Sequence, residues 1–118
     1  MADQTIPSIK NLRGNIGIGT ASPNALLHVK STGNGEVEIE RASGALINLQ
    51  AQAARGVIGT DSNHELQFKS NATAQMSIST SGDAEILTDG KGLILSSPDG
   101  TRYKITVANG GGVTSTAM

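Results

Sequence analysis

Apolar residues recur in pairs two positions apart along most of the chain, and a cluster of turn-forming residues follows each pair. The regular pairs are Ile47/Leu49, Leu66/Phe68, Met76/Ile78, Ala84/Ile86, Leu93/Leu95 and Ile105/Val107. A period of two places both members of a pair on one face of a β-strand. The clusters, among them Ser70-Asn71, Ser81-Gly82, Asp89-Gly90 and Asp99-Gly100, recur about every ten residues, a spacing typical of consecutive short strands. The pattern predicts an all-β fold of short antiparallel strands and hairpins.

Two further stretches fit this scheme less directly. Glu36–Arg41 alternates strictly, so Val37 and Ile39 share the inward face of a half-buried strand whose glutamates face solvent. The stretch from Ala45 to Arg55 is rich in residues with good helix propensity. Because it lacks a strong N-cap and its neighbours are strands, we expect a strand there, with a short helix as the alternative.

The chain begins with spaced apolar residues, Ile6, Ile9 and Leu12, and with Pro7 among them. Proline disfavours a helix in this position. We therefore expect residues 1–13 to form an extended N-terminal arm and residues 14–118 to form a single β-rich domain.

In residues 14–29, the order of the residues predicts local structure more specifically than it does in the rest of the chain. If this stretch is extended, Ile16 and Ile18 lie on one face and Gly17 and Gly19 on the other. Glycine weakens a strand, so two on one face indicate that another backbone approaches closely or that the strand bends. Close approach between chains and a glycine-rich bend within one chain are both compatible with the pattern.

A proline corner, Ser22-Pro23-Asn24, divides the stretch, and Leu27-His28-Val29 follows as a second strand. The order of these residues resembles the "GNVGIGT-x-SP-x-x-LHV" module of phage tail fibres and related trimeric fibre proteins, with Ile16 where valine is common. Ser97–Val107 is similar to the closing segment of many short phage fibre proteins.

The resemblance implies an elongated, intertwined homotrimeric fibre. Apolar residues on the inward strand faces are then the candidates for a trimer core, and Gly17 and Gly19 are the close-approach glycines. The core candidates are Ile16, Ile18, Leu27, Val29, Val37, Ile39, Leu66, Phe68, Met76, Ile78, Leu93, Leu95, Tyr103, Ile105 and Val107.

Composition supports association independently of the resemblance. The 118 residues include only two aromatic residues, Phe68 and Tyr103, and no cysteine. A small domain with few large side chains and no disulfides is difficult to stabilise alone, and oligomerisation is a common remedy. The residues alone argue for association, whereas the number three comes from the resemblance. The formal net charge of −1 and the absence of basic clusters indicate neither nucleic-acid binding nor membrane insertion.

Catalytic and metal-binding patterns are not found in the sequence. Gly90-Lys91 lacks the leading glycine and following hydroxyl of a phosphate loop. Neither His28 nor His64 belongs to a His-x-His pair, so we expect surface or interface roles for both. The glutamates of Glu36–Arg41 form a row on one strand rather than an acid and base across a cleft. We expect no enzyme activity, cofactor or metal.

The resemblance implies a structural virion component, a tail fibre or fibre segment that is made in the host cytoplasm and displays loops for attachment to the host surface. Its expected partners are two further copies of the chain, other virion proteins and host cell-surface carbohydrate. A purely structural stem or capsid-decorating fibre without receptor binding is the alternative. A polysaccharide depolymerase module is less expected, since no lined groove is evident.

Overall fold

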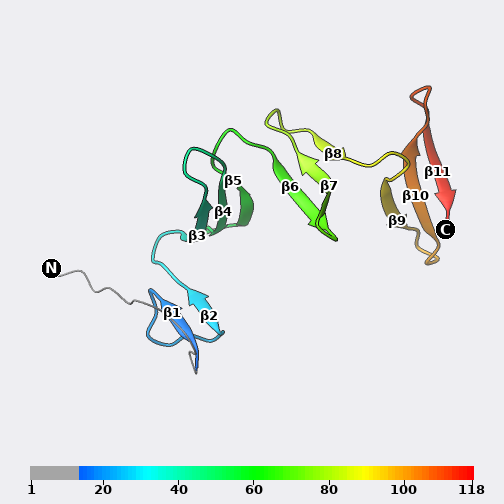
Figure 1. Ribbon diagram of the computed structural model, residues 1–118. Helices are drawn as coiled ribbons and strands as arrows, with labels where there is room; N and C mark the ends of the chain where they lie inside the picture. Colours follow the sequence, from blue (N-terminus) through cyan, green and yellow to red (C-terminus); the bar gives the residue numbers. More distant parts are fainter. Residues whose placement is uncertain (1–13) are drawn as a thin grey trace. The chain divides into compact units, whose positions relative to one another are not determined.

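A computed structural model describes residues 14–118 (Figure 1). The chain separates into two compact units, residues 1–62 and 63–118, and each is described by itself. All regular structure in the described part is β-strand, which confirms the all-β prediction. The expectation of a single β-rich domain over residues 14–118 stays a prediction. The predicted N-terminal arm lies outside the described residues.

The described part of the first unit, residues 14–62, contains five strands. β1 (Ile16–Ile18) and β2 (Leu27–Val29) form a two-stranded pair. The strands β3 (Gly35–Glu40), β4 (Leu46–Ala51) and β5 (Gly56–Thr60) form an antiparallel sheet in sequence order. The stretch with high helix propensity is therefore the central strand β4, as predicted.

The β1–β2 pair is parallel, and here the expectation of antiparallel strands was wrong. Parallel neighbours usually need a connection of about a dozen residues or more. Residues 19–26 make this crossing because Gly19 turns the chain in the left-handed region, with φ +76°, and the proline corner follows.

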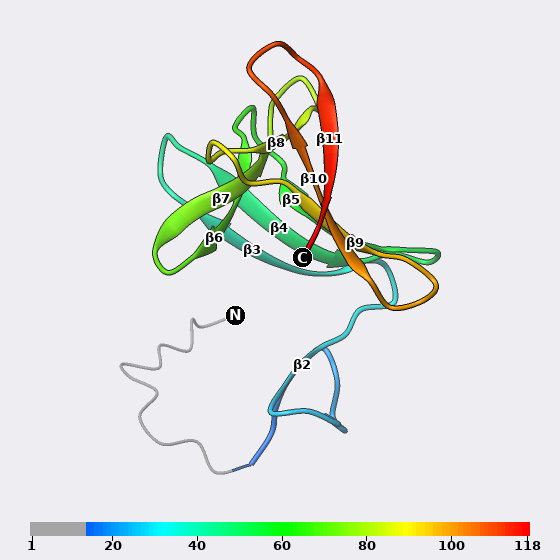
Figure 2. The same cartoon turned by 90° about the vertical axis from the view of Figure 1, so that its right-hand side faces the viewer.

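The second unit holds two antiparallel sheets of three strands each. One consists of β6 (Leu66–Ser70), β7 (Thr73–Ile78) and β8 (Ala84–Ile86), with a β-bulge between Phe68 and Lys69. The other consists of β9 (Leu93–Ser96), β10 (Arg102–Val107) and β11 (Val113–Ala117), with β10 in the centre. Figure 2 shows β10 and β11, in orange and red, side by side.

Three hairpins in this unit use the same five-residue connection, over residues 79–83, 97–101 and 108–112. In each, the N–H of the first residue donates to the carbonyl of the fifth at 2.8 Å. The fourth residue is always a glycine with positive φ, namely Gly82, Gly100 or Gly111, and its N–H donates back to the first carbonyl. This is a type I turn followed by a left-handed residue, a common hairpin loop.

The turns predicted at Ser81-Gly82 and Asp99-Gly100 are thus hairpin loops. Asp89-Gly90 is different, because it lies in the linker between β8 and β9, which belong to different sheets. There the N–H of Lys91 donates to the carbonyl of Thr88 at 3.1 Å, so the chain turns without pairing the flanking strands.

The described residues include no buried hydrophobic side chain. Two polar residues on central strands are buried instead: Asn48 of β4 is 2% exposed and Ser77 of β7 is 0% exposed. In its own structure, each sheet therefore has hydrogen-bonded strands but no enclosed apolar core.

Candidate interaction surface

The β3–β4–β5 sheet carries its apolar residues on one face. The strand register aligns Val37 with Leu49 and Leu49 with Ile58, and it aligns Ile39 with Ile47. Residues that are directly opposite in neighbouring strands share a face. All five side chains remain exposed.

The β6–β7–β8 sheet repeats this arrangement. Phe68, Met76 and Ile86 are aligned across its three strands. Leu66 and Ile78 form the next aligned pair on the same face, with Ala84 beside them. Phe68 is exposed in the single chain, and its place in a trimer core stays a prediction.

In the β9–β10–β11 sheet, Leu93 is aligned with Ile105 and Leu95 with Tyr103. Val107 is aligned with Val113 of β11. Val113 is 72% exposed, among the highest values for a large apolar side chain in the described part. We refer to these three surfaces together as the apolar faces.

The predicted core candidates all lie on these faces or on the shared face of β1 and β2, where Ile16 is aligned with Leu27 and Ile18 with Val29. None of them is buried within the chain. Five further residues complete the faces: Ile47, Leu49, Ile58, Ile86 and Val113. Ile47, Leu49 and Ile86 belong to apolar pairs predicted from the sequence. Val113 could be assigned to this face only from its register against β10.

The opposite face of the β3–β4–β5 sheet holds a hydrogen-bonded polar group. Glu36 Oε2 accepts from Gln50 Nε2 at 2.6 Å and from Asn48 Nδ2 at 3.3 Å. The predicted glutamate row therefore begins with a residue that ties β3 to β4. A shift of one residue in register would place these polar side chains on the apolar face, so the group favours the observed register.

The β1–β2 pair is held together by its own corner. The Asn15 side chain donates to the Pro23 carbonyl at 3.1 Å, and the Asn24 N–H donates to His28 Nδ1 at 3.4 Å. The Ile16 N–H donates to the Leu26 carbonyl at 2.8 Å. These contacts explain the order of residues in this stretch, and they give His28 a structural role within the chain.

Both glycines of this stretch are close to backbone of the same chain. A Cβ at Gly17 would lie 2.4 Å from the Thr20 carbonyl oxygen, and one at Gly19 would lie 2.0 Å from that of Lys30. Real Cβ atoms essentially never come closer than 3.0 Å to such an atom. Both glycines therefore allow close approach within one chain, while close approach between chains at these positions stays a prediction.

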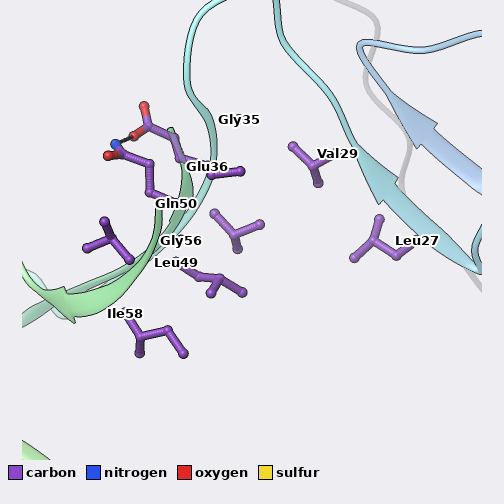
Figure 3. Close-up of a pocket in the computed structure, with 11 residues that line it drawn as sticks. Leu27, Val29, Gly35, Glu36, Leu49, Gln50, Gly56 and Ile58 are labelled. Atoms are coloured by element: carbon purple, nitrogen blue, oxygen red, sulfur yellow. Dashed lines mark hydrogen bonds between the residues drawn. The ribbon is translucent and has the colours of Figure 1, made fainter. Parts of the chain in front are cut away.

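An apolar hollow of about 630 Å³ lies between β2 and the β3–β4–β5 sheet. Figure 3 shows Leu27 and Val29 of β2 directed toward Leu49 and Ile58 of the sheet across this space. Few polar groups border it. The hollow adds to the apolar surface that the chain leaves uncovered.

Among residues 14–118, no group of three or more His, Asp or Glu side chains is arranged to hold a metal ion. The same residues include no helix long and apolar enough to cross a membrane. The most prominent feature of the described chain is its uncovered apolar surface, which can bind another apolar surface.

Comparisons of the chain with protein-family models, with curated proteins and with solved structures found no significant match.

Proposed function

We propose that the chain is a structural segment of a phage tail fibre. Three copies cover one another's apolar faces, and the assembly displays hairpin loops for attachment to a host surface. The support for association is physical, whereas the fibre, its threefold number and its attachment role rest on the resemblance of residues 14–29 and 97–107 to fibre segments.

The observation that carries the proposal is the exposure of large apolar side chains on ordered strand faces. Fourteen such residues of the described part are exposed on the apolar faces or on the shared face of β1 and β2, most of them by about half. Completing the burial of one half-exposed Ile, Leu or Val contributes about 1 kcal/mol. Covering all of them contributes on the order of 15 kcal/mol per chain, similar to the entire stability of a typical domain.

A stem without receptor binding is the second candidate, and the positions of the aromatic residues favour it. Sugar sites commonly use exposed aromatic rings as platforms. Phe68 and Tyr103 both lie on apolar faces, where association of copies would cover them. Attachment would then depend on polar loops or on hollows between the loops.

Neighbouring residues of β9 provide a matched test of the association surface. Leu95 lies on the apolar face and is 54% exposed, while Ile94 lies on the opposite face and is 44% exposed. We expect Leu95→Lys to lower the assembled fraction at least tenfold in analytical ultracentrifugation, because it would bury a charge between copies. We expect Ile94→Lys to assemble as the unmodified chain does.

Equal assembly of both variants would exclude this face as the interface.

Attachment is tested separately by incubating the fluorescently labelled assembly with a panel of bacterial strains. Binding to at least one strain supports the attachment role. A complete assembly that binds no strain in the panel favours the stem, and shortening of purified capsular polysaccharide would show depolymerase activity instead.

A further inference from the structure

A second hollow, of about 390 Å³, lies in the first unit between two connecting segments of the chain. One wall is formed by residues 29–35, which lead from β2 into β3, and the other by residues 51–53, at the end of β4. Its volume falls within the range of small-molecule sites. Of its lining side chains, only those of Val29 and Ala51 share a strand face with the core candidates. The hollow is therefore bordered mainly by residues outside the apolar faces.

The walls of this hollow are held in place by backbone contacts. The Lys30 N–H donates to the Ile18 carbonyl at 2.9 Å, which fixes the start of the first wall. The same wall folds back on itself, because a Cβ at Gly35 would lie 3.6 Å from the Val29 carbonyl oxygen. Gly35 is also aligned with Ala51, so the pairing of β3 with β4 joins the two walls. The hollow is formed before any ligand arrives, which lowers the entropic cost of binding.

The charge on the lining favours an anion. The ammonium of Lys30 is the one formal charge among the lining side chains, and within residues 14–118 no Asp or Glu lines the hollow. The carboxylate of Glu36, which comes next along the chain, accepts hydrogen bonds from Gln50 and Asn48 on the opposite face of the sheet. A cation would therefore meet Lys30 without a carboxylate to bind it, whereas an anion would be attracted.

Uncharged hydrogen-bond donors accompany the ammonium on the same wall. Ser31, Thr32 and Asn34 all line the hollow. The Ser31 hydroxyl accepts from the Gly33 N–H at 3.1 Å and keeps its own proton to donate. Within the described residues, no hydrogen bond or ion pair engages the side chains of Lys30, Thr32 or Asn34. The backbone N–H groups of Thr32 and Asn34 likewise donate to no carbonyl in this part of the chain.

We propose that this hollow binds a dianionic phosphoryl group. Its oxygens accept hydrogen bonds from the hydroxyls of Ser31 and Thr32 and from the amide of Asn34, while the Lys30 ammonium balances part of its charge. Free phosphate and a phosphate monoester present the same oxygens, so the test compares these two sources. The inference goes beyond the proposed function and does not depend on whether copies of the chain form a fibre.

Inorganic phosphate and methyl phosphate are the probes, since one is the free ion and the other a monoester. Dimethyl phosphate is the comparator, because it keeps the phosphorus centre but carries one negative charge. Each is titrated at constant pH, near neutral, and at low salt, into the isotopically labelled full-length chain in its natural oligomeric state. The readout is the set of backbone amide resonances in an NMR spectrum.

We expect at least one of the two dianions to shift the resonances of residues 30–35 and 51–53, and to bind at least fivefold more tightly than dimethyl phosphate. Tighter binding of methyl phosphate would assign the site to a monoester. Tighter binding of inorganic phosphate would assign it to the free ion. Either result supports a phosphoryl site.

Two substitutions test the lining. We expect Lys30→Gln to weaken phosphate binding at least fivefold, because it removes the single charge of the hollow. We expect Asn34→Asp to abolish binding, because it places a carboxylate of the same shape beside the anion. Lys69→Gln is the matched control, since Lys69 lies on β6 in the other unit, and it should leave the affinity unchanged. Unshifted resonances of β1 and β2 in Lys30→Gln would show that the local fold persists.

The inference is overturned if neither dianion shifts the resonances of residues 30–35, if dimethyl phosphate binds as tightly as methyl phosphate, or if Lys30→Gln binds phosphate as well as Lys69→Gln does. The oligomeric state is a separate result. A monomer that binds phosphate here would contradict the fibre proposal and keep this site, whereas a trimer without phosphate binding would keep the fibre proposal and reject the site.

Discussion

At the scale of single residues, Ala72 has a backbone conformation that its side chain disfavours. Asn71 and Ala72 form the tight turn between β6 and β7, with φ of +49° and +59°. Asparagine tolerates this left-handed region, whereas alanine adopts it at a cost of about 1–2 kcal/mol. The turn at Ser70-Asn71 was predicted from composition, but the strain at Ala72 could not be, because alanine does not mark a turn of this type.

Replacing Ala72 by glycine should relieve this strain. We expect Ala72→Gly to raise the free energy of unfolding by about 1 kcal/mol in chemical denaturation. Ala74→Gly is the control, since Ala74 lies within β7, and it should lower stability by about 0.5–1 kcal/mol. A decrease in stability for Ala72→Gly would show that the turn differs from the one described.

Asp99 gives the chain a pH-dependent loop. The Ser97 hydroxyl, followed by the backbone N–H of Thr101 at 2.9 Å, holds the pKa of the Asp99 carboxyl below its ordinary value of 3.8. Because the pKa is lower in the folded state, the resulting stabilisation is complete above the unfolded pKa. It is lost as the pH falls through the folded pKa.

Ser97→Ala removes the largest cause of this shift. We expect the pKa of Asp99 to rise toward 3.8 in this variant, as followed by the NMR resonance of its carboxyl carbon during an acid titration. Ser81→Ala, in the neighbouring hairpin loop, serves as the control and should leave Asp99 unchanged. If the pKa of Asp99 were the same in Ser97→Ala as in the unmodified chain, the Ser97 hydroxyl would not be a cause of the lowered pKa.

At the scale of elements, the strands could be predicted because alternation is a local property of the sequence. Leu66/Phe68 and Ile105/Val107 form strands with the expected faces. The parallel pairing of β1 with β2 could not be predicted, because the direction of pairing depends on how residues 19–26 cross over. That crossing depends on a left-handed Gly19 and on hydrogen bonds from Asn15 and to His28.

The crossing makes Gly19 a sensitive position. We expect Gly19→Ala to destabilise the β1–β2 pair by at least about 2 kcal/mol, because alanine is strained at φ +76° and its Cβ would overlap the Lys30 carbonyl. The resonances of β1 and β2 should then show increased hydrogen exchange. Gly56→Ala meets no atom within 4 Å and should change stability by less than about 0.5 kcal/mol.

Protection of β1 and β2 that is unchanged in Gly19→Ala would show that the close approach to Lys30 is not required. If Gly56→Ala were as destabilising as Gly19→Ala, the loss of stability would come from replacing a glycine in general and not from overlap with the Lys30 carbonyl. The pair of variants therefore separates local overlap from a general preference for glycine.

At the scale of the whole molecule, the composition indicated the lack of a buried apolar core in the described part of the chain better than any motif did. Phe68 and Tyr103 are the only aromatic residues, and the described part of the chain holds no buried hydrophobic residue. Which residues share a strand face could be predicted because this follows directly from alternation, whereas the role of these faces in association stays a prediction. The hollow between residues 29–35 and 51–53 was not predicted, because these segments meet only through the pairing of β3 with β4.

The charge on the chain does not oppose association. The formal net charge is −1, so copies repel one another weakly at neutral pH. Association through the apolar faces would therefore meet no strong electrostatic barrier. Assembly driven by them should persist at high salt, which would screen attraction between charged surfaces.

The central claim is that copies of this chain cover one another's apolar faces, and the mass of the purified protein in solution tests it most directly. Multi-angle light scattering should give three chains of 12.0 kDa, or about 36 kDa, at both low and high salt. A stable, folded monomer of 12.0 kDa would contradict the account.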